Sequence, residues 1–184
     1  MIEQYKIFQD EGEDFTSTTA NKDKLQKLPY SIRSAGWFWS IEKKLNISAD
    51  KNDFIYITKE INGGYTNFDD RLIHLKAGFK VFGKQFKEYQ FKDSEAYEDK
   101  RASFGWGLWH DPLLDKVGFI KDKEKAIEGY KRYLALITKN STPYNWNKIS
   151  SMVNFINLRQ KVDGEIKVSV LAVVNQQLEK LQKL

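Results

Sequence analysis

Apolar residues recur at helical spacing along most of the chain. The clearest run is Leu72, Leu75, Phe79 and Phe82, which predicts a helix that ends at Gly83. The same kind of spacing predicts further helices around residues 2–8, 29–45, 54–61, 126–137, 149–156 and 168–181. The pattern therefore predicts an all-α fold.

Polar and glycine-containing stretches separate these runs. Asn62-Gly63-Gly64 is a strong break, since adjacent glycines allow backbone angles that other residues avoid. Residues 16–24 and 139–145 are predicted to be polar connections, and 84–100 has no clean period. The segment SFGWGLWHDP (103–112) is rich in glycine and tryptophan, which predicts a loop or turn.

Two aspartates are positioned to cap helices, and one segment has an alternative interpretation. Asp53 and Asp122 each precede a predicted helix, where a carboxylate accepts a backbone hydrogen bond. The β-branched run KVSVLAVV (167–174) also fits a strand, although the sequence offers no evident partner strand.

Composition narrows the possible functions. The chain has 184 residues and an aromatic fraction of 14%, which indicates a bulky core, an aromatic-lined site, or both. The sequence has no cysteine and two histidines, so we expect neither a metal site nor a cofactor. The net charge of +5 is small and interspersed, so we do not expect nucleic-acid binding.

The sequence carries no targeting signal that we can identify. No apolar run is long enough to cross a bilayer, so no membrane partner is expected. The amino-terminal segment is acidic and lacks the apolar core of a signal peptide. These features leave the location unknown, with the cytoplasm expected unless a holin or a secretion machine releases the protein.

Two motifs resemble a known enzyme family. They are LPYSIRSAGWFWS (28–40), with its Trp-Phe-Trp cluster, and ITKEINGGYTNFDDRLIHLKAGFKVFG (57–83), with its Ile-Asn-Gly-Gly turn and Asp-Arg pair. Together and in this order they resemble the distal half of glycoside hydrolase family 19, the plant-type chitinases and their bacterial and phage cell-wall-lytic relatives. Residues 2–15 resemble the region just after the family's second catalytic segment.

The resemblance implies a lysozyme-like helical lobe over residues 1–85, with a helical extension of unclear role over 86–184. Family members use two glutamates, a general acid and a general base, which lie upstream of the matched region. Neither of those glutamate motifs occurs in this sequence. We therefore expect little or no hydrolysis by this chain alone, because inverting glycosidases need both carboxyl groups.

Asn62 and Arg71 are the predicted catalytic residues. The resemblance implies that Asn62 binds sugar and helps to hold the attacking water, and that Arg71 supports the acid electrostatically. An amide side chain suits this role because it both donates and accepts hydrogen bonds. The alternatives are that Asn62 only ends a helix, and that Arg71 pairs with Asp69 or Asp70.

Arg33, Trp37 and Tyr65 are the predicted substrate-binding residues. The resemblance implies that Arg33 contacts substrate, and a solvated helix face is the alternative. Trp37, like Trp39, has a flat face that can stack on a pyranose ring, with packing in the core as the alternative. We expect Tyr65 to be exposed and to line a groove.

The sequence gives weaker support for a functional role of four other residues. Trp106, Trp109 and His110 are candidates for a second aromatic patch, although large aromatic residues also anchor ordinary loops. Glu60 lies near Asn62, but nothing in the spacing of the acidic residues indicates a catalytic pair.

The leading hypothesis is a truncated or split chitinase-like or endolysin-like protein that acts on or binds β-1,4-linked N-acetylglucosamine polymers, either peptidoglycan or chitin. Its expected partners are such a polysaccharide and a separately encoded catalytic lobe. The alternative is a non-catalytic module, one that binds glycans or that binds other proteins through its helices.

Overall fold

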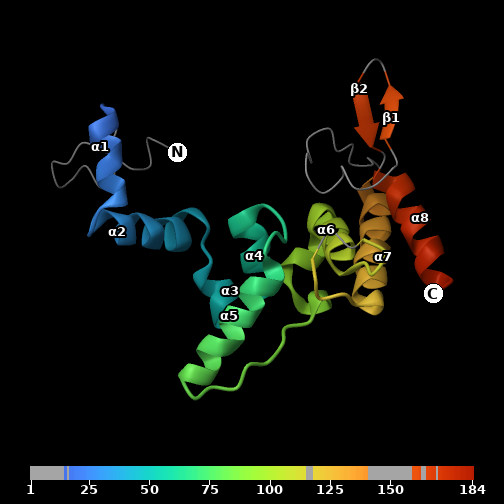
Figure 1. The fold of residues 1–184 in the computed structure, drawn as a ribbon, viewed down its shortest axis with the longest axis horizontal. Helices are drawn as coiled ribbons and strands as arrows, with labels where there is room; N and C mark the ends of the chain where they lie inside the picture. The colour runs from blue at the N-terminus through green and yellow to red at the C-terminus, as the bar shows by residue number, and fades with distance from the viewer. Residues whose placement is uncertain (1–14, 16, 115–117, 141–158, 163–164, 169) are drawn as a thin grey trace. The chain divides into compact units, whose positions relative to one another are not determined.

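The computed structural model describes residues 15, 17–114, 118–140, 159–162, 165–168 and 170–184 (Figure 1). The helices predicted around residues 2–8 and 149–156 lie outside these residues. Contacts divide the chain into two compact units, residues 1–50 and 51–184.

The first unit contains short helical segments: α1 (Thr19–Asp23), η2 (Lys24–Gln26), α2 (Tyr30–Trp37), the π-helix η3 (Phe38–Glu42) and α3 (Asn46–Asp50). The prediction of a loop over 16–24 is wrong, because Thr18 Oγ1 accepts from Asn21 N at 3.1 Å and caps α1. The helix predicted over 29–45 is confirmed from Tyr30 to Glu42.

The second unit is also mainly helical. It contains α4 (Phe54–Asn62), α5 (Phe68–Val81), η4 (Phe91–Asp93), η5 (Glu95–Glu98), α6 (Lys100–His110), α7 (Lys123–Asn140), β1 (Arg159–Val162), β2 (Glu165–Val168) and α8 (Val170–Gln182). The all-α fold class is confirmed, with one antiparallel hairpin among the described residues. Arg159 pairs with Val168 in this hairpin, so the KVSVLAVV run ends a strand and then begins a helix.

The prediction of a loop over 103–112 is wrong, because α6 runs through it and residues 102–110 are all buried. Asp99 caps this helix by accepting from Ala102 N at 2.8 Å. The glycines serve close packing: a Cβ on Gly107 would collide with the Tyr130 ring. A Cβ on Gly129 would lie 2.5 Å from Gly107 N. These glycines therefore mark a helix–helix contact.

Helices α6, α7 and α8 form the core of the second unit. Helix α6 packs against α7, and α8 packs along α7 (Figure 1). The buried carboxylate of Asp111 joins all three, since it accepts from Leu113 N at 2.8 Å, Tyr130 Oη at 2.7 Å and Gln177 Nε2 at 2.9 Å. Asp122 caps α7 as predicted, accepting from Lys125 N at 3.0 Å.

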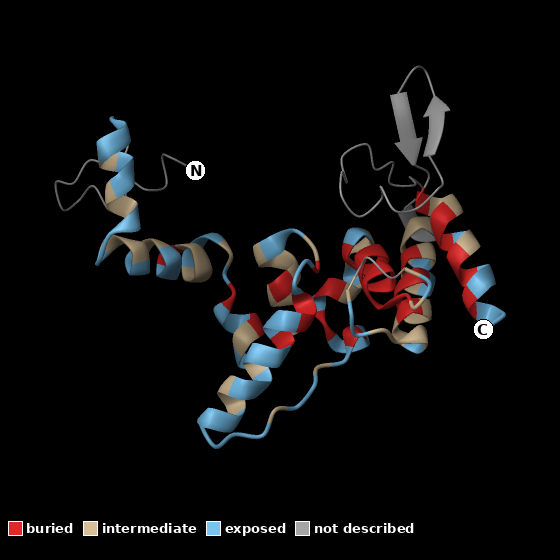
Figure 2. Ribbon diagram, viewed as in Figure 1, coloured by how far each residue is buried: buried red, intermediate tan, exposed pale blue. Residues whose placement is uncertain are grey.

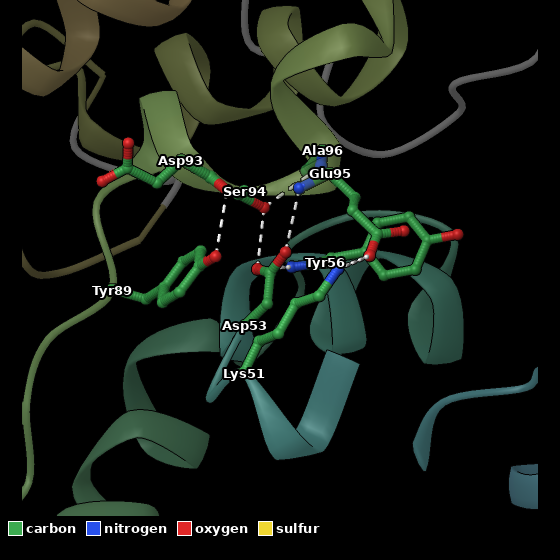
Figure 3. Close-up of polar contacts among 8 residues, drawn as sticks. All are labelled: Lys51, Asp53, Tyr56, Tyr89, Asp93, Ser94, Glu95 and Ala96. Atoms are coloured by element: carbon green, nitrogen blue, oxygen red, sulfur yellow. Dashed lines mark hydrogen bonds and ion pairs between the residues drawn. The ribbon is translucent and has the colours of Figure 1, made fainter. Parts of the chain in front are cut away.

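A second buried carboxylate, Asp53, positions α4. It accepts from Tyr56 N at 3.0 Å, which confirms the predicted cap. It also accepts from Ser94 Oγ at 2.8 Å and from Glu95 N at 2.9 Å, as Figure 3 shows. The start of α4 is therefore fixed to the η4–η5 segment.

The predicted helix ending near Gly83 is confirmed as α5. Its first half is anchored by Asp69, whose buried carboxylate accepts from Trp109 Nε1 at 3.0 Å, Phe119 N at 2.7 Å and Ile120 N at 3.1 Å. Beyond Leu72, the helix is exposed or half-buried (Figure 2). The Asp69 contacts cross the division predicted between residues 85 and 86.

Candidate functional site

The turn between α4 and α5 carries the residues that the sequence singled out most strongly. Helix α4 ends at Asn62, and Gly63 then adopts a left-handed conformation with φ of 66°. Asn67 is also left-handed, with φ of 58°, and precedes α5. The break predicted at Asn62-Gly63-Gly64 is confirmed.

The structure brings together the two predicted catalytic residues. Arg71 Nη2 donates to Asn62 Oδ1 at 3.1 Å, and Asn62 Nδ2 donates to Thr66 O at 3.1 Å. Both Asn62 and Arg71 are exposed. The alternative in which Asp69 is the partner of Arg71 does not hold, because Asp69 is buried with Trp109 and the backbone of Phe119 and Ile120.

These contacts fix the orientation of the Asn62 amide without using all of its hydrogen-bonding capacity. An amide oxygen has two lone pairs and an amide nitrogen has two hydrogens. Each atom therefore keeps capacity for an external donor or acceptor. The absence of a side chain on Gly63 lets a ligand come close to the backbone beside this amide.

Charged groups also lie along α4 and at the start of α6. Lys59 Nζ is 2.6 Å from Glu60 Oε1 and 3.0 Å from Asp99 Oδ2. Burial alone would lower the pKa of Lys59, but its hydrogen bonds to Glu60 and Asp99 outweigh burial and raise it. Burial opposes ionisation of Asp99, yet the Ala102 N–H and Lys59 hold its pKa below the ordinary value. Asp99 is therefore unsuited to act as a general acid.

Arg101 is a neighbour of the turn that sequence reasoning missed. A Cβ placed on Gly63 would lie 3.8 Å from Arg101 Nη2, so this guanidinium lies beside the turn. Arg101 is at the start of α6, outside the matched motifs, and no spacing signal connects it to Gly63. Only the packing of α6 against the α4–α5 region reveals it.

The expectation that Tyr65 lines a groove is wrong, since this residue is only 1% exposed. Its ring packs edge-on against Phe68 and Trp106, with centroid distances of 5.8 and 5.4 Å. It also lies against Gly105, where a Cβ would be 3.2 Å from Tyr65 Cδ2. The double glycine thus directs Tyr65 inward, and burial raises the pKa of its hydroxyl.

The other two predicted substrate-binding residues lie in the first unit. Arg33 is exposed on α2. Trp37, at the end of α2, is 7% exposed, which fits the packing interpretation rather than stacking on a sugar.

Of the two interpretations of Trp106, Trp109 and His110, burial fits structural anchoring rather than an aromatic patch, because all three are buried in α6. His110 Nδ1 donates to Ile120 O at 3.0 Å. Burial lowers the pKa of His110 to about 4, so the imidazole is neutral at pH 7 and is inaccessible as a surface base.

No family model matches the chain, and no solved structure matches it significantly. Within the described residues, no three potential metal ligands gather, and no helix has the length and apolar character needed to cross a bilayer. The strongest candidate site is therefore the surface around Asn62, Arg71 and Arg101, which we call the Asn62 surface.

Proposed function

We propose that this chain binds β-1,4-linked N-acetylglucosamine polymers, peptidoglycan or chitin, as a lysozyme-like lobe related to family-19 glycoside hydrolases. The observation that carries the proposal is the 3.1 Å hydrogen bond from Arg71 to Asn62 at an exposed Gly-Gly turn. Both residues belong to the motif at 57–83, and the fold joins them on one surface.

The chemistry of the Asn62 surface suits an amino sugar. An N-acetyl group presents one amide donor and one amide acceptor, and an oriented asparagine complements both. Arg71 holds Asn62 Oδ1, and Thr66 O holds Asn62 Nδ2, so less rotational freedom is lost when a ligand binds. The exposed guanidinium groups of Arg71 and Arg101 add donors for hydroxyl and carbonyl oxygens.

The proposal is one of binding, with hydrolysis dependent on carboxyl groups supplied from elsewhere. Inverting hydrolysis needs one carboxylic acid that protonates the leaving oxygen and one carboxylate that activates water. The acidic groups beside α4, Glu60 and Asp99, are both engaged by Lys59. A separately encoded catalytic lobe would supply the missing pair.

Titration calorimetry of the full chain with N-acetylglucosamine oligomers and with soluble peptidoglycan fragments tests the proposal. We expect binding of at least one ligand, and we expect Asn62→Ala to weaken it about tenfold. Asn175→Ala is the matched control, because Asn175 is an exposed asparagine on α8. The control should bind as the wild type does.

Absence of binding to both ligands, or an equal loss in Asn62→Ala and Asn175→Ala, would overturn the proposal. A reducing-sugar assay checks the expected lack of turnover. Release of reducing ends by the wild type, abolished in Asn62→Ala, would show that this chain needs no separate catalytic lobe.

A further inference from the structure

The carboxyl-terminal half of α5 bears a groove that the proposed function does not use. It has a volume of about 430 Å³ and is lined by His74, Leu75, Gly78, Phe79, Phe82 and Lys84. This volume falls within the range of about 300–1,000 Å³ that is typical of ligand pockets. We call this feature the α5 groove.

The surface around the α5 groove is unusually apolar for a solvent-facing helix end. Phe82, which lines the groove, is 80% exposed, and the neighbouring Val81 is 81% exposed. A side chain built on Gly78 would have no neighbour within 4 Å, so this wall of the groove is open. Phe82 both lines the groove and is largely exposed, and an exposed apolar side chain at an apolar groove favours a binding site.

The charge around the groove has one sign. Residues 71–87 contain no Asp or Glu, and their cations are Arg71, Lys76, Lys80, Lys84 and Lys87. Lys84 lines the groove, and Lys76 Nζ lies 5.5 Å from the centroid of the Phe86 ring. The next carboxylate, Glu88, is engaged by Lys125 at 2.7 Å. An occupant with complementary charge must therefore be acidic.

From these observations we infer that the α5 groove binds an acidic amphipathic helix of a partner protein, which inserts large apolar side chains between lysines. Helices that dock in this way place anchors at positions i, i+3, i+4 and i+7. A second copy of this chain is a poorer occupant, because a symmetric contact would place lysines against lysines. A lipid bilayer is also a poorer occupant, since its flat surface would not fill the α5 groove.

Fluorescence anisotropy with two labelled synthetic helices tests this inference on the full chain. Both carry leucine at positions i, i+3, i+4 and i+7; one has glutamate at the remaining positions and the other has lysine. We expect the acidic helix to bind at least about tenfold more tightly than the basic one, and more weakly as salt is raised.

Two substitutions sharpen the test. Phe82→Ser and Lys80→Glu should each weaken binding of the acidic helix about tenfold. Lys180→Glu, on the exposed face of α8, is the matched control and should leave binding unchanged. Circular dichroism should show that Phe82→Ser melts as the wild type does.

Equal affinity for the two helices, or no effect of Phe82→Ser, would overturn the inference. So would capture of the chain by phosphatidylglycerol vesicles that Phe82→Ser prevents, or a wild-type dimer that Phe82→Ser dissociates. Binding of N-acetylglucosamine oligomers should be unchanged in Phe82→Ser, so the inference and the proposed function can fail independently.

Discussion

Helices α5 and α6 both carry large apolar side chains, but these side chains differ in how far they are buried. In α6, nine of eleven residues are buried, whereas in α5 only Phe68, Asp69 and Leu72 of fourteen residues are buried. Helix α6 is held between the Tyr65–Phe68 pair on one side and Tyr130 on the other. Helix α5 is anchored near its beginning by the buried Asp69, and Phe82, just after its end, is 80% exposed.

The difference shows that burial of a helix depends more on the neighbouring helices that pack against it than on its number of apolar residues. Glycines 107 and 129 allow α6 and α7 to approach at backbone distance, and the aromatic rings then fill the space around this contact. The far half of α5 has no such contact in the part of the chain that the structure describes. Phe82, directly after α5, is 80% exposed.

The largest expected effect comes from breaking the close contact of α6. Gly129→Ala would place Cβ 2.5 Å from Gly107 N and 2.7 Å from Ser103 O, so a helix must shift. We expect a loss of about 3 kcal/mol or more in the free energy of unfolding. Gly78→Ala on α5 is the control, because it meets no atom within 4 Å. Urea denaturation should show a gain of about 0.5–1 kcal/mol for this control.

Burial of His110 in α6 predicts a loss of stability in acid. Its pKa of about 4 lies below the ordinary 6.5, so the unfolded chain takes up this proton first as the pH falls. The contribution of His110 to the free energy of unfolding is complete above pH 6.5. It declines as the pH falls to about 4, by roughly 3 kcal/mol in all. An NMR titration should place the imidazole midpoint near 4.

A midpoint near the ordinary value would contradict the buried position of His110. Denaturation at several pH values provides a second check, because His110→Gln should lose less stability between neutral and acid pH than the wild type does. His74→Gln controls for replacing a histidine on the exposed part of α5.

The buried and exposed ends of α5 can be compared by substituting alanine for Leu72 and for Phe82, which directly follows the helix. Leu72 is buried with Phe54, Phe68 and Trp106, so Leu72→Ala should cost about 2 kcal/mol. Phe82 is exposed, so Phe82→Ala should change the free energy of unfolding by less than about 0.5 kcal/mol. Thermal denaturation of both variants measures the contrast. Similar losses in the two variants would mean that Phe82 is also packed in solution.

Several of these features could be predicted from the sequence because they are local. The spacing of Leu72, Leu75 and Phe79 predicts α5, and Asp53 precedes α4 as a cap should. The turn at Asn62-Gly63 follows from the conformational freedom of glycine. Each of these signals lies within a few residues of the structure that it specifies.

The features that could not be predicted depend on residues far apart in the chain. Glycines in SFGWGLWHDP indicate a loop when considered locally, but Gly105 leaves room for the Tyr65 ring and Gly107 leaves room for Tyr130 of α7. Periodicity identifies the apolar face of α5, but not that the residues after Leu72 on this helix are exposed or half-buried. Arg101 reaches the Asn62 surface only because α6 packs there.

The smallest expected effects come from removing the hydroxyl groups of two buried tyrosines, one that packs against α6 from α7 and one from the α4–α5 turn. Tyr130 Oη donates to Asp111 at 2.7 Å, whereas Tyr65 Oη has no hydrogen-bond partner among the described residues. Tyr130→Phe should therefore cost about 1–2 kcal/mol, because it leaves the buried carboxylate one donor short. Tyr65→Phe should be neutral or slightly stabilising, because it removes a hydroxyl that burial deprives of water. The affinity of the Tyr65→Phe variant for N-acetylglucosamine oligomers should also be unchanged, since Tyr65 is buried beneath the Asn62 surface. A Tyr65→Phe variant that folds normally but loses glycan binding would mean that this hydroxyl reaches the ligand, and that the turn opens when sugar binds.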